Sequence, residues 1–263
     1  MEGIESNMGK GRPNILTIAG FDPSGGAGLL ADIKTFEAHK TQGMAVCSAL
    51  TVQNDTQFIK TNWVSLPDMQ EQLEILRPRF TFKVVKIGLV ENFETLQQMI
   101  AHLKAMNPQV KIICDPVLKA SAGFVFHSEV AQQTLESVLS DLFLLTPNWE
   151  EVKQLSGQED AQAGAKYLSQ FCHIYLKGGH NTENPGKDFL FTKTSPQEDQ
   201  KEFTLNPKQT DVEGKHGSGC VFSSALAAHI ALEYPLLKAC VRAKTYVTKF
   251  LASNDSKLGY HRI

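Results

Sequence analysis

The sequence has little of what secreted, membrane-bound or nucleic-acid-binding proteins need. Its five cysteines are far apart and form no C-x-x-C pair, so neither a disulfide framework nor a cysteine-rich zinc site is predicted. No two Lys or Arg residues are adjacent, and 26 basic against 28 acidic residues leave a net charge of −2. That balance argues against a surface for nucleic acid or anionic lipid. No apolar run is long enough to span a bilayer. We therefore expect a cytoplasmic protein with no nucleic-acid partner and no membrane partner.

What is present suits one large α/β domain. The chain has 263 residues, of which 42% are hydrophobic and 21% charged, enough to build a sizeable core. The first 13 residues are polar and carry Glu2 and Glu5 where a signal peptide has positive charge. We expect residues 1–13 to form a flexible tail and residues 14–263 to form a single domain.

Short β-branched runs alternate with amphipathic helical patterns along the chain. Such alternation predicts a mostly parallel sheet with helices on both faces. A polar turn at 195–200 inside the segment 187–211 indicates a hairpin at the edge of the sheet. The expected strands are 14–19, 44–52, 84–89, 110–114, 142–145 and 174–176. One helix is expected directly after residue 28, and further helices are expected at 69–80, 96–103, 129–139, 161–171, 219–232 and 235–251.

Polar and glycine residues gather where these strands end. Ligands of open parallel sheets bind at the carboxyl ends of the strands, although turns also need such residues for their own geometry. The loop at 25–28 is rich in glycine, but no Gly-Lys-Ser/Thr follows, so it is not a P-loop. It is not G-x-G-x-x-G either, which disfavours a dinucleotide-dependent oxidoreductase.

A better anion site is the stretch His216-Gly217-Ser218-Gly219-Cys220, which opens an apolar helix. Glycines free consecutive N–H groups to point at one spot, and the helix dipole adds about half a positive charge. Cys220 lies in the first turn, where the pKa of a thiol falls from about 8.5 toward about 7. Its thiol could accept a proton from a substrate hydroxyl or hydrogen-bond to it. An ordinary helix entry and a small packing residue are the alternatives.

Asp115, Asn148 and Glu151 are the metal candidates, because Mg²⁺ prefers carboxylate and amide oxygens together with phosphate. Asn148 and Glu151 lie one helical turn apart, a spacing that also fits a capping box. Lys177 follows a strand and could bring positive charge to phosphates, or it could be a solvated surface lysine.

Two further side chains are candidates for recognising a small molecule. The Gln53 amide both donates and accepts, which suits a heterocycle that presents a ring nitrogen beside an amino group. Its alternative is a turn amide that bonds only backbone or water. Asp32 could accept from an amine or a hydroxyl, or it could be a solvated carboxylate on a helix.

Taken in order, these segments resemble the hydroxymethylpyrimidine/phosphomethylpyrimidine kinases of thiamine biosynthesis, within the ribokinase-like superfamily. The similarity runs from about residue 14 to about residue 250 and is much more specific than any single motif. The segments that carry it are TIAGFDPSGGAGLLADIKTF, ALTVQN, KIGL, DPV, LLTPNWEE, LKGGH and HGSGC.

The resemblance implies a three-layer α/β sandwich that transfers the γ-phosphoryl group of ATP to the pyrimidine and then to its monophosphate. It also implies a homodimer and a set of roles. Gly217, Ser218, Gly219 and Cys220 would form the anion hole, with Cys220 in the place of an aspartate base. Gln53, Ala27, Asp32, Leu89 and Val117 would bind the pyrimidine, Asp115, Asn148 and Glu151 would organise Mg²⁺, and Lys177 and Gly179 would lie near the ATP phosphates.

The chain departs from the family pattern at Phe21, Val52, Leu89 and Ser218, and Lys119 comes two places early. These changes affect the substrate pocket more than the reaction class. Pyridoxine or pyridoxal kinase activity is therefore the alternative function, and a non-catalytic ligand-binding module is a second. The polar segment 178–187 is a candidate lid.

Overall fold

The computed structural model describes residues 11–117, 132–180, 184–193, 200–207 and 213–262. Across these ranges the strands form one sheet in the order β3-β2-β1-β4-β5-β6-β7-β8-β9, which is parallel from β2 to β7. β3 and the hairpin of β8 and β9 are antiparallel edges. The bounds are β1 (Asn14–Phe21), β2 (Gln42–Gln53), β3 (Phe58–Trp63), β4 (Val84–Ile87), β5 (Lys111–Cys114), β6 (Leu144–Leu145), β7 (His173–Leu176), β8 (Asp188–Phe191) and β9 (Glu202–Leu205).

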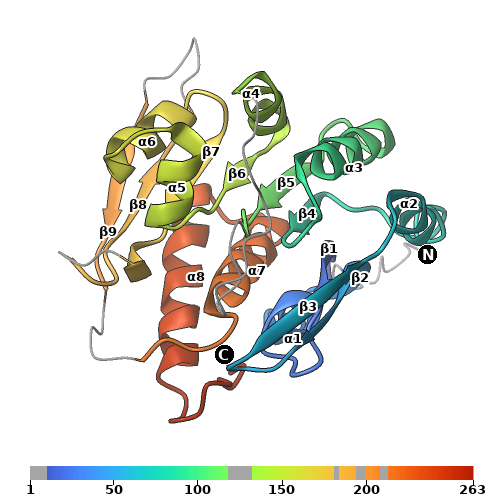
Figure 1. Cartoon of the computed structure of the whole chain (residues 1–263), viewed down its shortest axis with the longest axis horizontal. Helices are drawn as coiled ribbons and strands as arrows, with labels where there is room; N and C mark the ends of the chain where they lie inside the picture. The colour runs from blue at the N-terminus through green and yellow to red at the C-terminus, as the bar shows by residue number, and fades with distance from the viewer. Residues whose placement is uncertain (1–10, 118–131, 181–183, 194–199, 208–212, 263) are drawn as a thin grey trace, which may run out of the picture.

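Helices cover both faces of this sheet (Figure 1). One layer holds α1 (Gly28–Ala38), α7 (Ser218–Ala231) and α8 (Leu236–Leu251). The other holds α2 (Leu66–Glu74), α3 (Phe93–Met106), α4 (Gln132–Asp141), α5 (Trp149–Ser156) and α6 (Ala161–Leu168).

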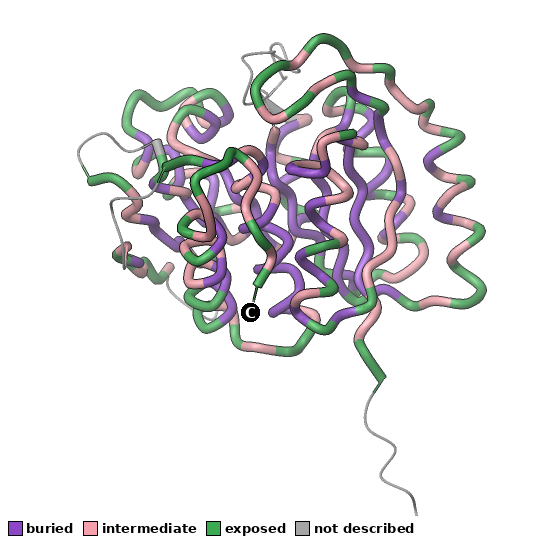
Figure 2. The backbone as a smooth tube through the Cα atoms, turned by 90° about the horizontal axis from the view of Figure 1, so that it is seen from below, coloured by how far each residue is buried: buried purple, intermediate pink, exposed green. Residues whose placement is uncertain are grey.

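Successive residues of the central strands feed two separate cores. Val84 packs with the α1, α7 and α8 layer, whereas its neighbour Val85 packs with the other layer. Because side chains alternate across a strand and both faces are covered, the strands consist of nearly continuous apolar runs. Figure 2 shows the result as buried strands inside a shell of exposed turns. The predicted sandwich of three layers around a mostly parallel sheet is confirmed.

Helix α7 is the most enclosed helix of its layer. Every residue from Val221 to Ile230 is buried, and the helix packs against α1, α8, β1, β4 and β5. A helix that is apolar all round belongs in a core. Its first turn is therefore held firmly at the carboxyl end of the sheet.

Three local expectations need correction. The sequence did not predict β3, which pairs antiparallel with β2 at the sheet edge. The helix expected over 69–80 ends at Glu74, and the turns that follow reach Arg79. Within the predicted tail, Arg12 contacts Glu37 of α1, and residues 1–10 lie outside the described residues. No helix among those described is long and apolar enough to span a membrane.

Candidate active site

The candidate residues gather at the carboxyl ends of the parallel strands. The strand order reverses between β1 and β4, which is where open α/β sheets form a ligand crevice. Beyond β6 and β7, Asn148 and Lys177 form an isolated parallel bridge, so these two loops run side by side. The loop after β1 and the start of α7 complete the rim.

Gly217 fixes how α7 begins. It has φ of 72°, in the left-handed region, and caps the helix that starts at Ser218. A Cβ at Gly217 would lie 1.9 Å from the carbonyl oxygen of Gly26, so only glycine fits. The first turn of α7 is thus packed directly on the glycine-rich loop that follows β1. N–H groups of such a first turn have no acceptor within the helix and can bind an anion.

A hydrogen bond that the sequence analysis missed joins these two loops. His216 Nε2 lies 2.8 Å from Asp22 Oδ2, and the same carboxylate accepts from the backbone N–H groups of Ser24 and Ala27. Burial alone would raise the pKa of Asp22, but the hydrogen bonds from His216, Ser24 and Ala27 hold it below its usual value. Asp22 therefore shapes the loop that presents Ala27, a predicted substrate contact.

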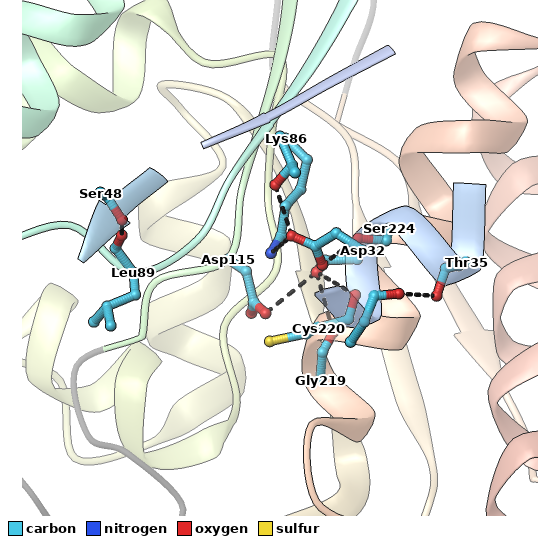
Figure 3. A network of polar contacts seen from close by, with 12 residues as sticks. Asp32, Thr35, Ser48, Lys86, Leu89, Asp115, Gly219, Cys220 and Ser224 are labelled. Atoms are coloured by element: carbon cyan, nitrogen blue, oxygen red, sulfur yellow. Dashed lines mark hydrogen bonds and ion pairs between the residues drawn. The ribbon is translucent and has the colours of Figure 1, made fainter. Parts of the chain in front are cut away.

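Cys220 differs from its prediction. It is the third residue of α7, as expected, and Figure 3 shows its sulfur on the side of the helix that faces Asp115. Burial raises the pKa of the thiol to about 11, an effect that the nearby ammonium of Lys86 only partly offsets. The predicted lowering toward 7 is wrong because burial outweighs the helix dipole. At neutral pH Cys220 is a thiol, not a thiolate.

Lys177 joins two of the predicted metal ligands. Its Nζ lies 2.7 Å from Asp115 Oδ1 and 3.8 Å from Glu151 Oε2. The side chain is 18% exposed, so the solvated surface lysine is wrong. Burial alone would raise the pKa of Asp115, but Lys177 and Lys86 hold it below its usual value. Burial and the nearby Asp115 charge raise the pKa of Glu151 to about 7, although Lys177 opposes them.

Asn148 and Glu151 form the capping box that was the alternative to a metal site. Asn148 Oδ1 accepts from the Glu151 N–H at 2.9 Å, and Glu151 Oε2 accepts from the Asn148 N–H at 2.7 Å. Among the described residues no three His, Cys, Asp or Glu side chains gather around one point. Asp115 and Glu151 are nevertheless a donor set that fits Mg²⁺, which is usually held by one or two carboxylates, waters and the phosphates of a substrate.

The side chains predicted to read the substrate line two walls. Gln53 ends β2 and is half-buried, and Leu89 follows β4 with its Cδ2 3.0 Å from where a Cβ of Gly20 would lie. Val117 lines a mostly apolar pocket, which Gly88 and Pro116 also line. Leu89 is not among the residues that line this pocket.

Asp32 needs a correction, because it is neither solvated nor at the surface. Its carboxylate is fully buried and accepts hydrogen bonds from Thr17, Lys86 and Ser224. The sequence analysis did not single out Lys86, which lies in the middle of β4. The structure places Asp32 behind the rim, within the layer that supports it (Figure 3).

The glycines after β7 have different surroundings. A Cβ at Gly178 would lie 1.9 Å from the Lys187 carbonyl oxygen, so only a glycine lets the backbone at Lys187 pack this closely against position 178. Its N–H donates to Asp188 Oδ1 at 2.6 Å, whereas Gly179 is exposed and open. Of the predicted lid, residues 181–183 lie outside the described part, as does Lys119.

Residues 22–262 match the profile of a family described as phosphomethylpyrimidine kinase. The chain belongs to this family. It is 36% identical to the hydroxymethylpyrimidine/phosphomethylpyrimidine kinase of Aquifex aeolicus, over 93% of this chain and 96% of that one. It is 32% identical to the protein of that name in Escherichia coli, over 93% of each chain. The resemblance on which the sequence analysis relied is confirmed.

Solved structures agree on the fold. The phosphomethylpyrimidine kinase of Clostridium difficile superimposes with a TM-score of 0.73 at 28% identity, over 90% of this chain and 99% of that chain. An ADP complex of pyridoxal kinase from Staphylococcus aureus gives a TM-score of 0.76 at 24% identity, over 93% of this chain and 90% of that chain. The second likeness shows the fold alone. The ribokinase-like prediction is confirmed, and the chain is a member of a kinase family.

Proposed function

We propose that the protein transfers the γ-phosphoryl group of ATP to the hydroxymethyl oxygen of 4-amino-5-hydroxymethyl-2-methylpyrimidine, and then phosphorylates the monophosphate to the diphosphate, for thiamine biosynthesis. Family membership and one geometric observation support this. A Cβ at Gly219 would lie 3.6 Å from Lys177 Nζ and 3.7 Å from Asp115 Oδ2. The N-terminal turn of α7, a lysine and a carboxylate thus converge on one space, as a transferring phosphoryl group requires.

Each residue then has a role that its surroundings support. The N–H groups at the start of α7 stabilise charge on the transferring group, and Lys177 lies beside the nucleotide phosphates with Gly179. Asp115 and Glu151 would hold Mg²⁺, whose charge neutralises phosphate oxygens, while Asn148 orients Glu151 through the capping box. Gln53 reads the pyrimidine edge, with Ala27, Leu89 and Val117 beside the ring.

Cys220 acts in this proposal as a neutral hydrogen-bond partner of the acceptor hydroxyl. A loose phosphoryl-transfer transition state gathers little negative charge on the attacking oxygen, so positioning matters more than deprotonation. With a pKa of about 11, the thiol holds its proton throughout the physiological range.

An assay of ADP release with ATP and Mg²⁺ tests the proposal. The pyrimidine and pyridoxal are offered in parallel, and the products are followed by mass. Conversion of the pyrimidine to a diphosphate is expected. Preferential phosphorylation of pyridoxal would agree with the mechanism but would assign the protein to vitamin B6 salvage. Absence of ADP release with either acceptor would favour a non-catalytic ligand-binding module. We also propose a homodimer in the cytoplasm, which light scattering in solution and fractionation of cells test.

A further inference from the structure

Lys86 is a charged residue in the middle of the sheet that no role above explains. It lies in β4, its side chain is 0% exposed, and its Nζ donates to Asp32 Oδ2 at 2.8 Å. Burial alone would lower the pKa of Lys86, but the Asp32 charge raises it above the usual value, so the ammonium keeps its proton. A buried pair of this kind is seldom more stable than apolar residues of similar size. Stability alone therefore gives little reason for it.

The pair is one end of a chain of hydrogen bonds that reaches α7. Ser224 Oγ donates to Asp32 Oδ1 at 2.6 Å, and Thr17 Oγ1 donates to Oδ2 at 2.6 Å. Both hydroxyls are fully buried. One carboxylate of α1 thereby joins β1, β4 and α7, three elements that each carry part of the site.

The place of Ser224 on α7 connects this chain to the anion hole. Ser224 comes four residues after Cys220, so the two side chains lie on the same face of the helix. At the other end, a Cβ at Gly88 would lie 2.7 Å from Lys86 Nζ. The ammonium thus lies against the turn after β4, where Gly88 is followed by Leu89.

We propose that Lys86 is a positioning residue for phosphoryl transfer, which acts through Asp32 and Ser224 to fix the first turn of α7 against the substrate wall formed after β1 and β4. This inference rests on the proposed function. Full burial prevents Lys86 from touching a substrate. Its effect passes through the chain and through its charge, which also acts on Cys220 and Asp115. A misplacement of about 1 Å between reacting groups costs about a hundredfold in rate.

Two variants separate positioning from folding. Ser224→Ala leaves the ion pair intact and removes only its link to α7. We expect kcat to fall about tenfold while both KM values stay within about threefold, and we expect Ser224→Thr to restore most of the rate. Thr35→Val is the matched control, because Thr35 is equally buried in α1 but donates to Ala31 within its own helix.

The second variant combines Lys86→Met with Asp32→Leu and removes both charges at once. Paired replacement of a buried ion pair by apolar residues is close to neutral. The double variant should therefore fold, with a melting temperature lowered only by the Thr17 and Ser224 hydroxyls that lose their acceptor. Its kcat should fall about a hundredfold. If the folded double variant, or Ser224→Ala, keeps kcat within twofold of the wild type, Lys86 is merely structural and the inference is wrong.

Failure of the proposed function has a different signature. A wild-type chain that phosphorylates pyridoxal rather than the pyrimidine contradicts that function, yet the same variants still test Lys86 with pyridoxal as the acceptor. A wild-type chain that phosphorylates neither acceptor overturns both. An active wild type with unaffected variants overturns the inference about Lys86 alone.

Discussion

Two chains of lysine, aspartate and serine hold α7 in the molecule, and they differ in how far water reaches them. In the first, Lys86 and Asp32 are both 0% exposed, and Ser224 completes the chain. In the second, Lys177 is 18% exposed and Asp115 4%, and Ser223 Oγ donates to Asp115 at 3.2 Å. Adjacent serines of one helix thus bind two aspartates that each carry a lysine.

The difference separates a fixed support from a working site. In the first chain, Thr17 and Ser224 take up the rest of the Asp32 carboxylate, and both charged side chains are out of reach of water. Lys177, in contrast, has a second carboxylate 3.8 Å away in Glu151 and access to solvent. In the proposed mechanism its ammonium would move toward a nucleotide phosphate, which would leave Asp115 and Glu151 available to a cation. In the proposed mechanism the same residue types therefore hold α7 in place in the first chain and change binding partners during the reaction in the second.

The largest expected effect is on stability. It is found by replacing the aspartate of each hydrogen-bonded chain with asparagine, in separate variants. Asp32→Asn leaves the buried Lys86 ammonium without a counter-charge. We expect the free energy of unfolding, measured by urea denaturation, to fall by about 3–5 kcal/mol. Asp115→Asn should cost less, about 1–3 kcal/mol, because Lys177 keeps Glu151 as a second carboxylate and has some access to water. Asp141→Asn on the exposed end of α4 is the control. Equal losses for the two site variants would contradict the distinction between them.

The rate of transfer at saturating ATP should not follow the order of the stability losses, because Asp115→Asn should lower kcat at least as much as the loss of the Lys86–Asp32 pair. Asp115→Asn removes a carboxylate beside the transferring group, and we expect kcat to fall about a hundredfold or more, equivalent to about 2.7 kcal/mol. The Mg²⁺ concentration needed for half-maximal rate should rise as well. A kcat for Asp115→Asn close to that of Asp141→Asn would show that Asp115 has no role in phosphoryl transfer.

A smaller effect is expected from Lys177→Arg, which keeps the charge of the rim lysine but changes its shape. An arginine has a planar fork in place of a compact ammonium, so it fits poorly between Asp115 and Glu151. We predict an increase of about tenfold in the KM for ATP, with the KM for the pyrimidine unchanged. Steady-state kinetics with each substrate varied in turn measure both. A rise confined to the pyrimidine would assign Lys177 to the acceptor side.

The sequence predicted the elements and the rim of the site much better than the supports behind it. Periodicity located the parallel strands because each is a local apolar run, and motif order located Asp115 and the start of α7. Lys86 and Asp32 are 54 positions apart, and Asp22 and His216 are 194 apart, so no local pattern joins them. For Cys220, the rule for a helix N-terminus was local, whereas the burial that raises its pKa comes from the whole fold.

Cys220 lies between the two chains and gives the smallest expected effect. Its pKa of about 11 leaves the thiol protonated at neutral pH, so a hydroxyl of similar hydrogen-bonding capacity should replace it. Cys220→Ser should therefore keep kcat within about threefold. Alkylation of Cys220 by iodoacetamide, followed by mass spectrometry, should accelerate about tenfold per pH unit from pH 7 to 9, since the thiolate fraction is still rising there. A plateau near pH 7, together with a large loss in Cys220→Ser, would instead make Cys220 the base. In that case Lys86 would stabilise a thiolate, and the chain of Lys86, Asp32 and Ser224 would take part in the catalytic step as well as position α7.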